Sequence, residues 1–359
     1  MRRALAVLVA AVLLGAPAIA ETKIYTFPYT QPPAALNDTA HTVAEGETDV
    51  VLTFAGDCTL GGERAGGKRF AGVMEKNGYA YPFANLQGLF DSDDLTMVNL
   101  EGVLSDERSD KVRKKFNFIG KPEFAEILTQ GNVECVTLAN NHALDYGERG
   151  KRDTVSALTA KAIAYCDEQN VTILEKDGVR IGFTASGLQL NRDTYLKQAQ
   201  ALKALGCAAI VHNMHTGEEY ADTLTPNQQR TAEFLSDNGA ALVVGHHPHV
   251  AQGIALYGKT YVAFSLGNCV FGGNSDPDDY DACVLRATLR FRNGTLASET
   301  IVLWPIRVSG TRGRNDYQPV LLSGEDAKRV LDKMQKTSAF PLNPMVDGQG
   351  AVQPTANWQ

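Results

Sequence analysis

Residues 133–142 read Val-Glu-Cys-Val-Thr-Leu-Ala-Asn-Asn-His, a short apolar run that ends in two amides and an imidazole. An apolar, β-rich run of this length is typical of a buried strand in an α/β fold. Polar side chains that directly follow such a strand lie at its carboxyl end, where ligands bind in open α/β sheets. The stretch therefore predicts a fold class and the sheet edge at which a functional site should lie.

The same kind of apolar run recurs along the chain. Six further runs cover residues 50–55, 95–98, 179–185, 208–211, 241–244 and 261–266. Stretches with helical spacing separate several of them, at residues 122–130, 151–169, 194–205 and 226–238. Strands that alternate with helices predict an α/β protein.

The last third of the chain has a different order of predicted elements. Strand-like runs follow one another directly at residues 259–271, 282–291 and 295–304, and Asn293-Gly294 is a strong hairpin-turn signal between the last two. The sheets are therefore expected to be mixed, with antiparallel hairpins late in the chain. Residues 323–336 are expected to form a final helix.

Residues 1–20 have the layout of a secretory signal peptide. Arg2 and Arg3 precede an apolar stretch over residues 4–15, and the small-x-small triplet Ala18-Ile19-Ala20 follows it. The stretch is shorter than the roughly 20 apolar residues that a membrane span needs, which favours cleavage over a retained anchor. We expect an exported, periplasmic or extracellular protein with no transmembrane span after cleavage near Ala20.

The remaining chain is expected to form one domain. Residues 21–47 are polar and contain three prolines, which indicates an N-terminal arm. Residues 48–340 carry the strand and helix pattern, and residues 341–359 are rich in proline and glycine, as in a loose C-terminal tail.

Composition excludes several classes of protein. Of the 359 residues, 44% are hydrophobic and 21% charged, a globular balance that argues against wholesale disorder. The net charge of −7 argues against a nucleic-acid partner. Six cysteines are present without a Cys-x-x-Cys motif, which argues against a thiolate zinc site; small buried core residues are expected, and export would also permit disulfides.

Six of the seven histidines follow apolar runs in three short places. They are His142, then His212 and His215, then His246, His247 and His249. Two further strand ends carry oxygen ligands, Asp57 in one and Asn99 with Glu101 in the other. Nitrogen and oxygen ligands of these kinds suit Zn²⁺, Mn²⁺ or Fe²⁺, so the sequence predicts a site for one or two divalent metal ions.

These segments, in this order, resemble the capsule-synthesis (CapA-type, poly-γ-glutamate) proteins, a branch of the calcineurin-like metallophosphoesterases. The matching segments are residues 56–57, 99–101, 139–142, 145–147, 215–220, 245–250 with Gln252, and 265–268. The resemblance covers roughly residues 49–336. It implies a four-layer α/β/β/α sandwich in which two mixed sheets are flanked by helices and metals lie at strand ends.

The resemblance also implies a role for each matching residue. Asp57 and His249 would bind the first ion, and Glu101 would bridge. The second ion would be bound by Asn141, His215 and His246. His142 would face the substrate and take part in catalysis.

Two departures from the superfamily pattern concern the first ion. The usual Asp-x-His segment is Asp57-Cys58-Thr59 here, so one imidazole is missing. The bridging acid is Glu101 in an Asn-x-Glu segment rather than an Asp in a Gly-Asp motif. The first site is therefore expected to be weak, differently built or empty.

Other residues near these strand ends are expected to contact the substrate. They are Asn99, Asn140, His247, Lys114 and Lys115. His247 would either reach the substrate or lie on the surface. Residues 111–115 would form either a solvated basic loop or a cationic lip that steers an anionic substrate. His212 precedes His215 by three positions, so on a strand it should face the opposite side.

The leading hypothesis is an exported metal-dependent hydrolase-like protein that acts in poly-γ-glutamate or capsule polymer synthesis, export or processing. Its substrate would be an anionic polymer or a phosphoester, and a capsule-synthesis membrane complex is a candidate partner. One alternative is a non-catalytic polymer-binding assembly factor. Another is a periplasmic phosphoesterase unrelated to capsule.

Overall fold

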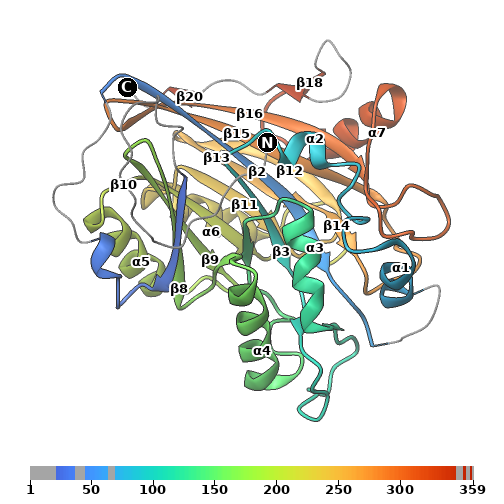
Figure 1. The fold of residues 1–359 in the computed structure, drawn as a ribbon. Helices are drawn as coiled ribbons and strands as arrows, with labels where there is room; N and C mark the ends of the chain where they lie inside the picture. Colours follow the sequence, from blue (N-terminus) through green and yellow to red (C-terminus); the bar gives the residue numbers. More distant parts are fainter. Residues whose placement is uncertain (1–21, 37–44, 64–68, 345–350, 353–355, 358–359) are drawn as a thin grey trace, which may run out of the picture.

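The computed structural model describes residues 22–36, 45–63, 69–344, 351–352 and 356–357. The expected signal peptide, residues 1–20, lies outside the described residues. Two large mixed β-sheets dominate the described chain (Figure 1).

The first sheet has seven strands in the order β1-β8-β9-β10-β11-β13-β12. Its central strands β9, β10, β11 and β13 pair in parallel, while its outer pairs are antiparallel. The bounds of its strands are β1 Lys23–Pro28, β8 Asn170–Lys176, β9 Val179–Ser186, β10 Cys207–His215, β11 Leu242–His246, β12 Ala251–Tyr257 and β13 Thr260–Leu266.

The second sheet runs in the order β18-β19-β16-β15-β2-β3-β6-β7, with β14 paired to β2 and both β17 and β20 paired to β16. Strands β15 and β16 form the hairpin predicted from Asn293-Gly294. The bounds are β2 Glu47–Thr59, β3 Leu95–Leu100, β6 Cys135–Thr137, β7 Ala164–Cys166, β14 Asn268–Phe271, β15 Asp281–Arg292, β16 Thr295–Arg307, β17 Val320–Leu321, β18 Asn343–Pro344, β19 Ala351–Val352 and β20 Ala356–Asn357. A separate pair joins β4 Val103–Leu104 to β5 Ile119–Gly120.

Helices cover the outer face of each sheet. On the first sheet these are α5 (Arg192–Ala204) and α6 (Pro226–Asp237), which share an apolar core with β10 and β11. On the second they are α1 Phe70–Asn77, α2 Gln87–Phe90, α3 Ala125–Gln130 and α4 Gly147–Ala160. A third apolar core fills the space between the two sheets and also takes in α7, Gly324–Gln335. The predicted four-layer α/β/β/α arrangement is confirmed (Figure 1).

Helix α6, expected from the helical spacing of residues 226–238, begins with a capping box. The side chain of Thr225 accepts a hydrogen bond from the backbone N–H of Gln228, whose side-chain oxygen accepts one from the backbone N–H of Thr225, and Pro226 occupies the first turn. This capping box satisfies backbone groups that a helix start leaves unpaired.

The helix expected over residues 151–169 is wrong in its second half. Helix α4 ends at Ala160, and Ala162 takes a positive φ of 55°. Residues 164–166 then form β7, parallel to β6. Pairing with a buried sheet edge outweighs the helical spacing there, because intrinsic propensity is a weak prior beside tertiary packing.

The two ends of the chain also contribute strands. Within the segment 21–47, which the sequence suggested to be an arm, β1 pairs along its whole length with β8. In the expected tail, short strands pair with β16. No helix in the described part of the chain is both long and apolar enough to cross a membrane.

Candidate metal centre

The ends of neighbouring strands bring the candidate ligands to one place. In the second sheet Asp57 of β2 is the register partner of Asn99 in β3. In the first sheet His215 of β10 is the register partner of His246 in β11. Both pairs are parallel, so their carboxyl ends share an edge, as the sequence predicted for a strand-end site.

Glu101, directly after β3, lies at the middle of this site. It belongs to two groups of side chains whose potential ligand atoms lie within 4.8 Å of one another. We call Asp57, Glu101 and His249 the first ligand set, and Glu101, His215 and His247 the second ligand set. All five side chains are buried, and Glu101 is common to both sets.

Glu101 is the residue that fits a metal best. Both of its carboxylate oxygens are buried and have no hydrogen-bond partner among the described residues. One of them, Oε1, lies 3.7 Å from Nε2 of His215 and 3.9 Å from Nε2 of His249. Burial raises the pKa of Glu101 to about 8, a cost that a bound cation would remove.

Asp57 is held by protein groups from three directions. Asn99 donates a hydrogen bond to its Oδ1 at 2.8 Å, and the backbone N–H of His247 donates to Oδ2 at 3.3 Å. Nδ1 of His249 lies 3.1 Å from Oδ2. Burial would raise the pKa of Asp57, but the neighbouring imidazoles of His246 and His249 hold it well below its usual value.

A hydrogen bond at Nδ1 orients the ring of His249. Nδ1 hydrogen-bonds to Oδ1 of Asn268 at 3.0 Å, which leaves Nε2 on the side of Glu101. Burial lowers the pKa of His249, but the carboxylates of Glu101 and Asp57 outweigh it and raise the pKa to about 10. Asn268 is a site residue without an assigned role in the sequence analysis, although its Ser-Leu-Gly-Asn segment was part of the resemblance.

The amides of the site have different surroundings. Oδ1 of Asn141 lies 2.9 Å from Nε2 of His215, beside the second ligand set. Asn140 donates to Oδ1 of Asn99 at 3.0 Å and to the carbonyl of Leu100 at 2.9 Å. The two amides expected to contact the substrate, Asn99 and Asn140, thus hydrogen-bond to each other and to the ends of β2 and β3.

His246 and His247 lie differently with respect to the two ligand sets. His247, not His246, joins Glu101 and His215 in the second ligand set. The ring of His246 instead has Nδ1 3.4 Å from Oδ1 of Asp57. His247 and His249 take positive φ angles of 98° and 58° after β11 ends at His246, so strand alternation does not apply to these two residues.

His142 is held on one side of the ligand sets. Its Nδ1 lies 2.7 Å from Oδ2 of Asp145, and its Nε2 lies 3.8 Å from Oε1 of Glu101. The ring packs against Phe118 with centroids 4.3 Å apart. Burial lowers the pKa of His142 although Asp145 opposes the shift. Asp145, three residues after His142, was noted in the sequence only as part of a motif.

The two candidate lysines lie in different environments. Nζ of Lys114 lies 2.5 Å from Oδ1 of Asp145 and donates to the carbonyl of Asn141 at 2.8 Å. Lys115 is exposed, and its Nζ lies 4.9 Å from the ring centroid of Phe116. Lys114 is therefore tied to the His142 side of the site, whereas Lys115 faces solvent.

His212 is placed as predicted, away from the ligand sets. Its ring nitrogens pair with Oγ1 of Thr184 at 2.8 Å and with Oγ of Ser186 at 2.9 Å. It is fully buried, and burial lowers its pKa to about 3. The prediction that His212 faces away from His215 is confirmed.

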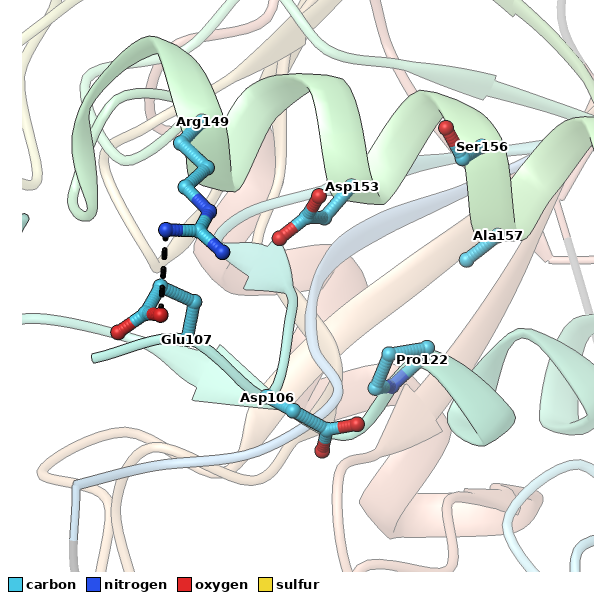
Figure 2. Close-up of a pocket in the computed structure, with 7 residues that line it drawn as sticks. All are labelled: Asp106, Glu107, Pro122, Arg149, Asp153, Ser156 and Ala157. Carbon is cyan, nitrogen blue, oxygen red and sulfur yellow. Dashed lines mark ion pairs between the residues drawn. The ribbon is translucent and has the colours of Figure 1, made fainter. Parts of the chain in front are cut away.

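A separate hollow lies beside helix α4 (Figure 2). Its lining residues are Asp106, Glu107, Pro122, Arg149, Asp153, Ser156 and Ala157. Arg149 forms an ion pair with Glu107 at 3.2 Å across it. Three acids against one base leave this hollow unsuited to an anionic substrate, and none of its residues belongs to the ligand sets.

The four-layer fold and the Asp, Glu, Asn and His side chains at its strand ends define a class of α/β/β/α proteins with a candidate metal centre. More specifically, the chain belongs to the family described as bacterial capsule synthesis protein PGA_cap, which matches residues 51–273.

Curated relatives carry related names. The chain is 30% identical over 251 residues to the capsule biosynthesis protein CapA of Bacillus anthracis, covering 62% of this chain and 60% of that protein. It is 27% identical over 260 residues to the PGA biosynthesis protein CapA of Bacillus subtilis, covering 63% and 67%. A probable polyglutamine synthesis accessory protein of Mycobacterium tuberculosis is 27% identical over 308 residues, covering 74% and 78%.

Among solved structures, the chain is similar to the protein TT1561 of Thermus thermophilus. The TM-score is 0.41 at 10% identity, over 66% of this chain and 94% of that one.

Proposed function

We propose that the protein is an exported, metal-dependent hydrolase-like member of this family that acts in poly-γ-glutamate or capsule polymer synthesis, export or processing. The observation that carries the proposal is Glu101, whose buried and unpartnered carboxylate lies between two sets of imidazoles. Burial of a carboxylate without a hydrogen-bond partner is costly, and a cation bound at this position would offset that cost.

The donor set suits one or two divalent ions of the Zn²⁺, Mn²⁺ or Fe²⁺ class. The first ligand set and the second ligand set would hold them, with Asn141 and His246 beside these sets as further candidates. Such ions act as Lewis acids and lower the pKa of a coordinated water.

His142 is the residue we propose for proton transfer. A carboxylate only accepts hydrogen bonds, so the pairing with Asp145 places the ring proton on Nδ1 and leaves Nε2 as an acceptor. Burial keeps the ring neutral at neutral pH by lowering its pKa. Nε2 would accept a proton during attack on the substrate and return it to the leaving group.

The role in polymer metabolism is supported by the relatives, whose names refer to capsule, PGA and polyglutamine synthesis. The proposed substrate is an anionic polymer or a phosphoester, with a capsule-synthesis membrane complex as a candidate partner. Export is supported by the charge and apolar layout of residues 1–20.

The test combines metal content with turnover. The purified protein is assayed for bound metal and for cleavage of poly-γ-glutamate and of a generic phosphodiester. Glu101→Gln should lower metal affinity by at least about 10-fold, since even supporting groups around a metal contribute about 10- to 100-fold. Glu299→Gln is the matched control, because Glu299 is also fully buried and unpartnered but lies on β16.

One observation favours a second candidate, a polymer-binding assembly factor without catalysis. Asp57 already accepts hydrogen bonds from Asn99 and from the His247 backbone. In addition, Thr59 occupies the position at which the usual Asp-x-His segment has its imidazole. The first ligand set would then hold an ion only weakly. Bound metal together with polymer binding, but without cleavage of either substrate, would place this candidate first.

A further inference from the structure

Two cysteines lie directly behind the candidate metal centre on neighbouring strands. Asn268 of β14 is the register partner of Asp57 in β2, and Phe271 is the partner of Thr59, so the register shifts between these pairs and Cys269 and Val270 both lie opposite Cys58. Successive side chains of a strand point to opposite faces. Both thiols accordingly lie in the apolar core between the second sheet and its helices, fully buried.

The backbones of the two strands come unusually close at this point. A Cβ built on Gly56 would lie only 1.9 Å from the carbonyl oxygen of Gly267, so this approach requires glycine. Neighbouring strands lie about 4.8 Å apart, and a bulge sets two residues of one strand opposite one residue of the other. Cys269 therefore lies across from Cys58 at about the Cα separation of 4.4–6.8 Å that a disulfide requires. After burial, the neighbouring side chain of Cys269 is the largest influence that raises the pKa of the Cys58 thiol.

The other four cysteines lack such a neighbour. Cys135 of β6 is the register partner of Ala164, and Cys166 of β7 is the partner of Thr137. These two cysteines are therefore diagonal neighbours, about 7–8 Å apart, which is beyond the range of a disulfide. Among the described strand pairs, Cys207 is opposite Arg180 and Cys283 is opposite Pro305.

We propose that Cys58 and Cys269 form a disulfide when the chain folds in an oxidising environment. The two thiols would exchange with a small-molecule disulfide such as oxidised glutathione. One S–S bond forms between the cysteines, the oxidant's S–S bond breaks, and the oxidant leaves as two thiols that carry the two protons and two electrons. This inference is independent of hydrolase activity and of metal binding.

The position of the bond gives it a structural role. It would fix β14 to β2 next to Asp57 and next to Asn268, which orients His249. Because both cysteines are fully buried in the folded chain, the bond should form before or as β14 docks. It joins residues far apart in the sequence, so it should stabilise the fold by restricting the unfolded chain.

The test is a thiol map of the full chain. The protein is produced by secretion into an oxidising compartment and, separately, in a reducing cytosol, from which it is purified, unfolded in denaturant and refolded in the presence of oxidised glutathione. Free thiols are blocked with a maleimide in denaturant, and the peptides are mapped by mass spectrometry without reduction. We expect four blocked cysteines, a linked Cys58–Cys269 peptide, and a melting temperature roughly 5–10 °C above that of the protein kept reduced throughout.

Single substitutions make the result specific. Cys58→Ala should leave all five remaining cysteines blocked, whereas the matched control Cys135→Ala should leave three blocked and the linked peptide intact. Six blocked cysteines in both preparations of the wild type, or a linkage between any other pair, would overturn the proposal. The count needs no variant to fold, because the wild type alone decides it.

Discussion

The ammonium group of Lys114 and the imidazole of His142 contact the same buried carboxylate, that of Asp145, at its two different oxygens. Lys114 Nζ lies 2.5 Å from Oδ1, and His142 Nδ1 lies 2.7 Å from Oδ2. The side chain of Asp145 is completely buried, and that of Lys114 is 28% exposed. A residue of the loop between β4 and β5 thereby supports the residue that we propose for proton transfer.

Replacing Lys114 should therefore weaken both the fold and the site. Lys114→Met leaves one oxygen of a buried carboxylate without its cation, and we expect a loss of about 1–3 kcal/mol in the free energy of unfolding. Turnover should fall more than substrate binding, because His142 loses its fixed orientation. Urea denaturation and steady-state kinetics measure the two effects.

The neighbouring Lys115 provides the control for this prediction. Lys115→Met should change stability by no more than about 0.5 kcal/mol, as is usual at exposed positions. If the two variants have the same stability and the same turnover, the pairing of Lys114 with Asp145 neither stabilises the fold nor positions His142, and the loop acts only through its charge.

His212 predicts a pH dependence that is separate from the metal centre. Its pKa is lowered to about 3 in the folded protein by burial, below the usual value of about 6.5 in the unfolded chain. Between these two pH values only the unfolded chain binds a proton at this histidine. The contribution of His212 to the free energy of unfolding is therefore fully present above about pH 6.5 and is lost as the pH falls toward 3. The slope that this group adds approaches about 1.4 kcal/mol per pH unit.

The measurement compares the wild type with His212→Gln in urea melts from pH 7 to pH 4. The variant should be less stable at pH 7, because Thr184 and Ser186 lose their partner, yet its stability should fall less steeply toward pH 4. Parallel curves for the two proteins would show that His212 is not the group responsible.

The position of the candidate site could be predicted from the sequence, because it follows from strand patterns. Asp57, Glu101 and His215 each end a run that buries apolar side chains, and parallel strands bring such ends to one edge. The opposite orientation of His212 followed from the alternation of side chains along β10. The mixed α/β class also followed from the strand and helix pattern with its late hairpin, whereas the four-layer sandwich was implied by the resemblance to the family.

Other features depend on contacts between segments far apart in the chain, which a local pattern does not carry. Ala162 at φ 55° ends α4 so that β7 can pair with β6, although the helical spacing continues. Lys114 meets Asp145 because the β4–β5 loop packs against the segment that follows β6, where the backbone N–H of Val112 also donates to the carbonyl of Asp145. The different positions of the His246 and His247 rings depend on a positive φ at His247.

That difference between adjacent histidines gives a direct comparison. Since His247 belongs to the second ligand set and His246 lies beside Asp57, His247→Ala should release the ion held with His215, and His246→Ala should retain most of it. Metal titration of both variants by calorimetry decides the matter. Equal retention in His247→Ala and the wild type, with loss in His246→Ala, would support the assignment implied by the family resemblance instead.

Asn141 and His142 are also adjacent, and substitution of each should have a different effect. Oδ1 of Asn141 lies 2.9 Å from His215 beside the second ligand set, so Asn141→Ala should reduce metal occupancy. Its backbone carbonyl, which accepts from Lys114, remains in place. His142→Ala should keep the metal and lose about 10²–10⁴-fold in turnover, the usual contribution of a positioned acid or base.

Packing complicates the His142 variant, because its ring contacts Phe118 and its removal leaves a gap. His142→Gln fills more of that space without supplying a group that titrates near neutral pH, so it should recover melting temperature but not turnover. Metal content, melting temperature and rate are therefore measured on all three variants. A His142→Gln protein that keeps its metal and cleaves substrate at the wild-type rate would mean that His142 serves the packing around Asp145 and that the proton is carried by another group.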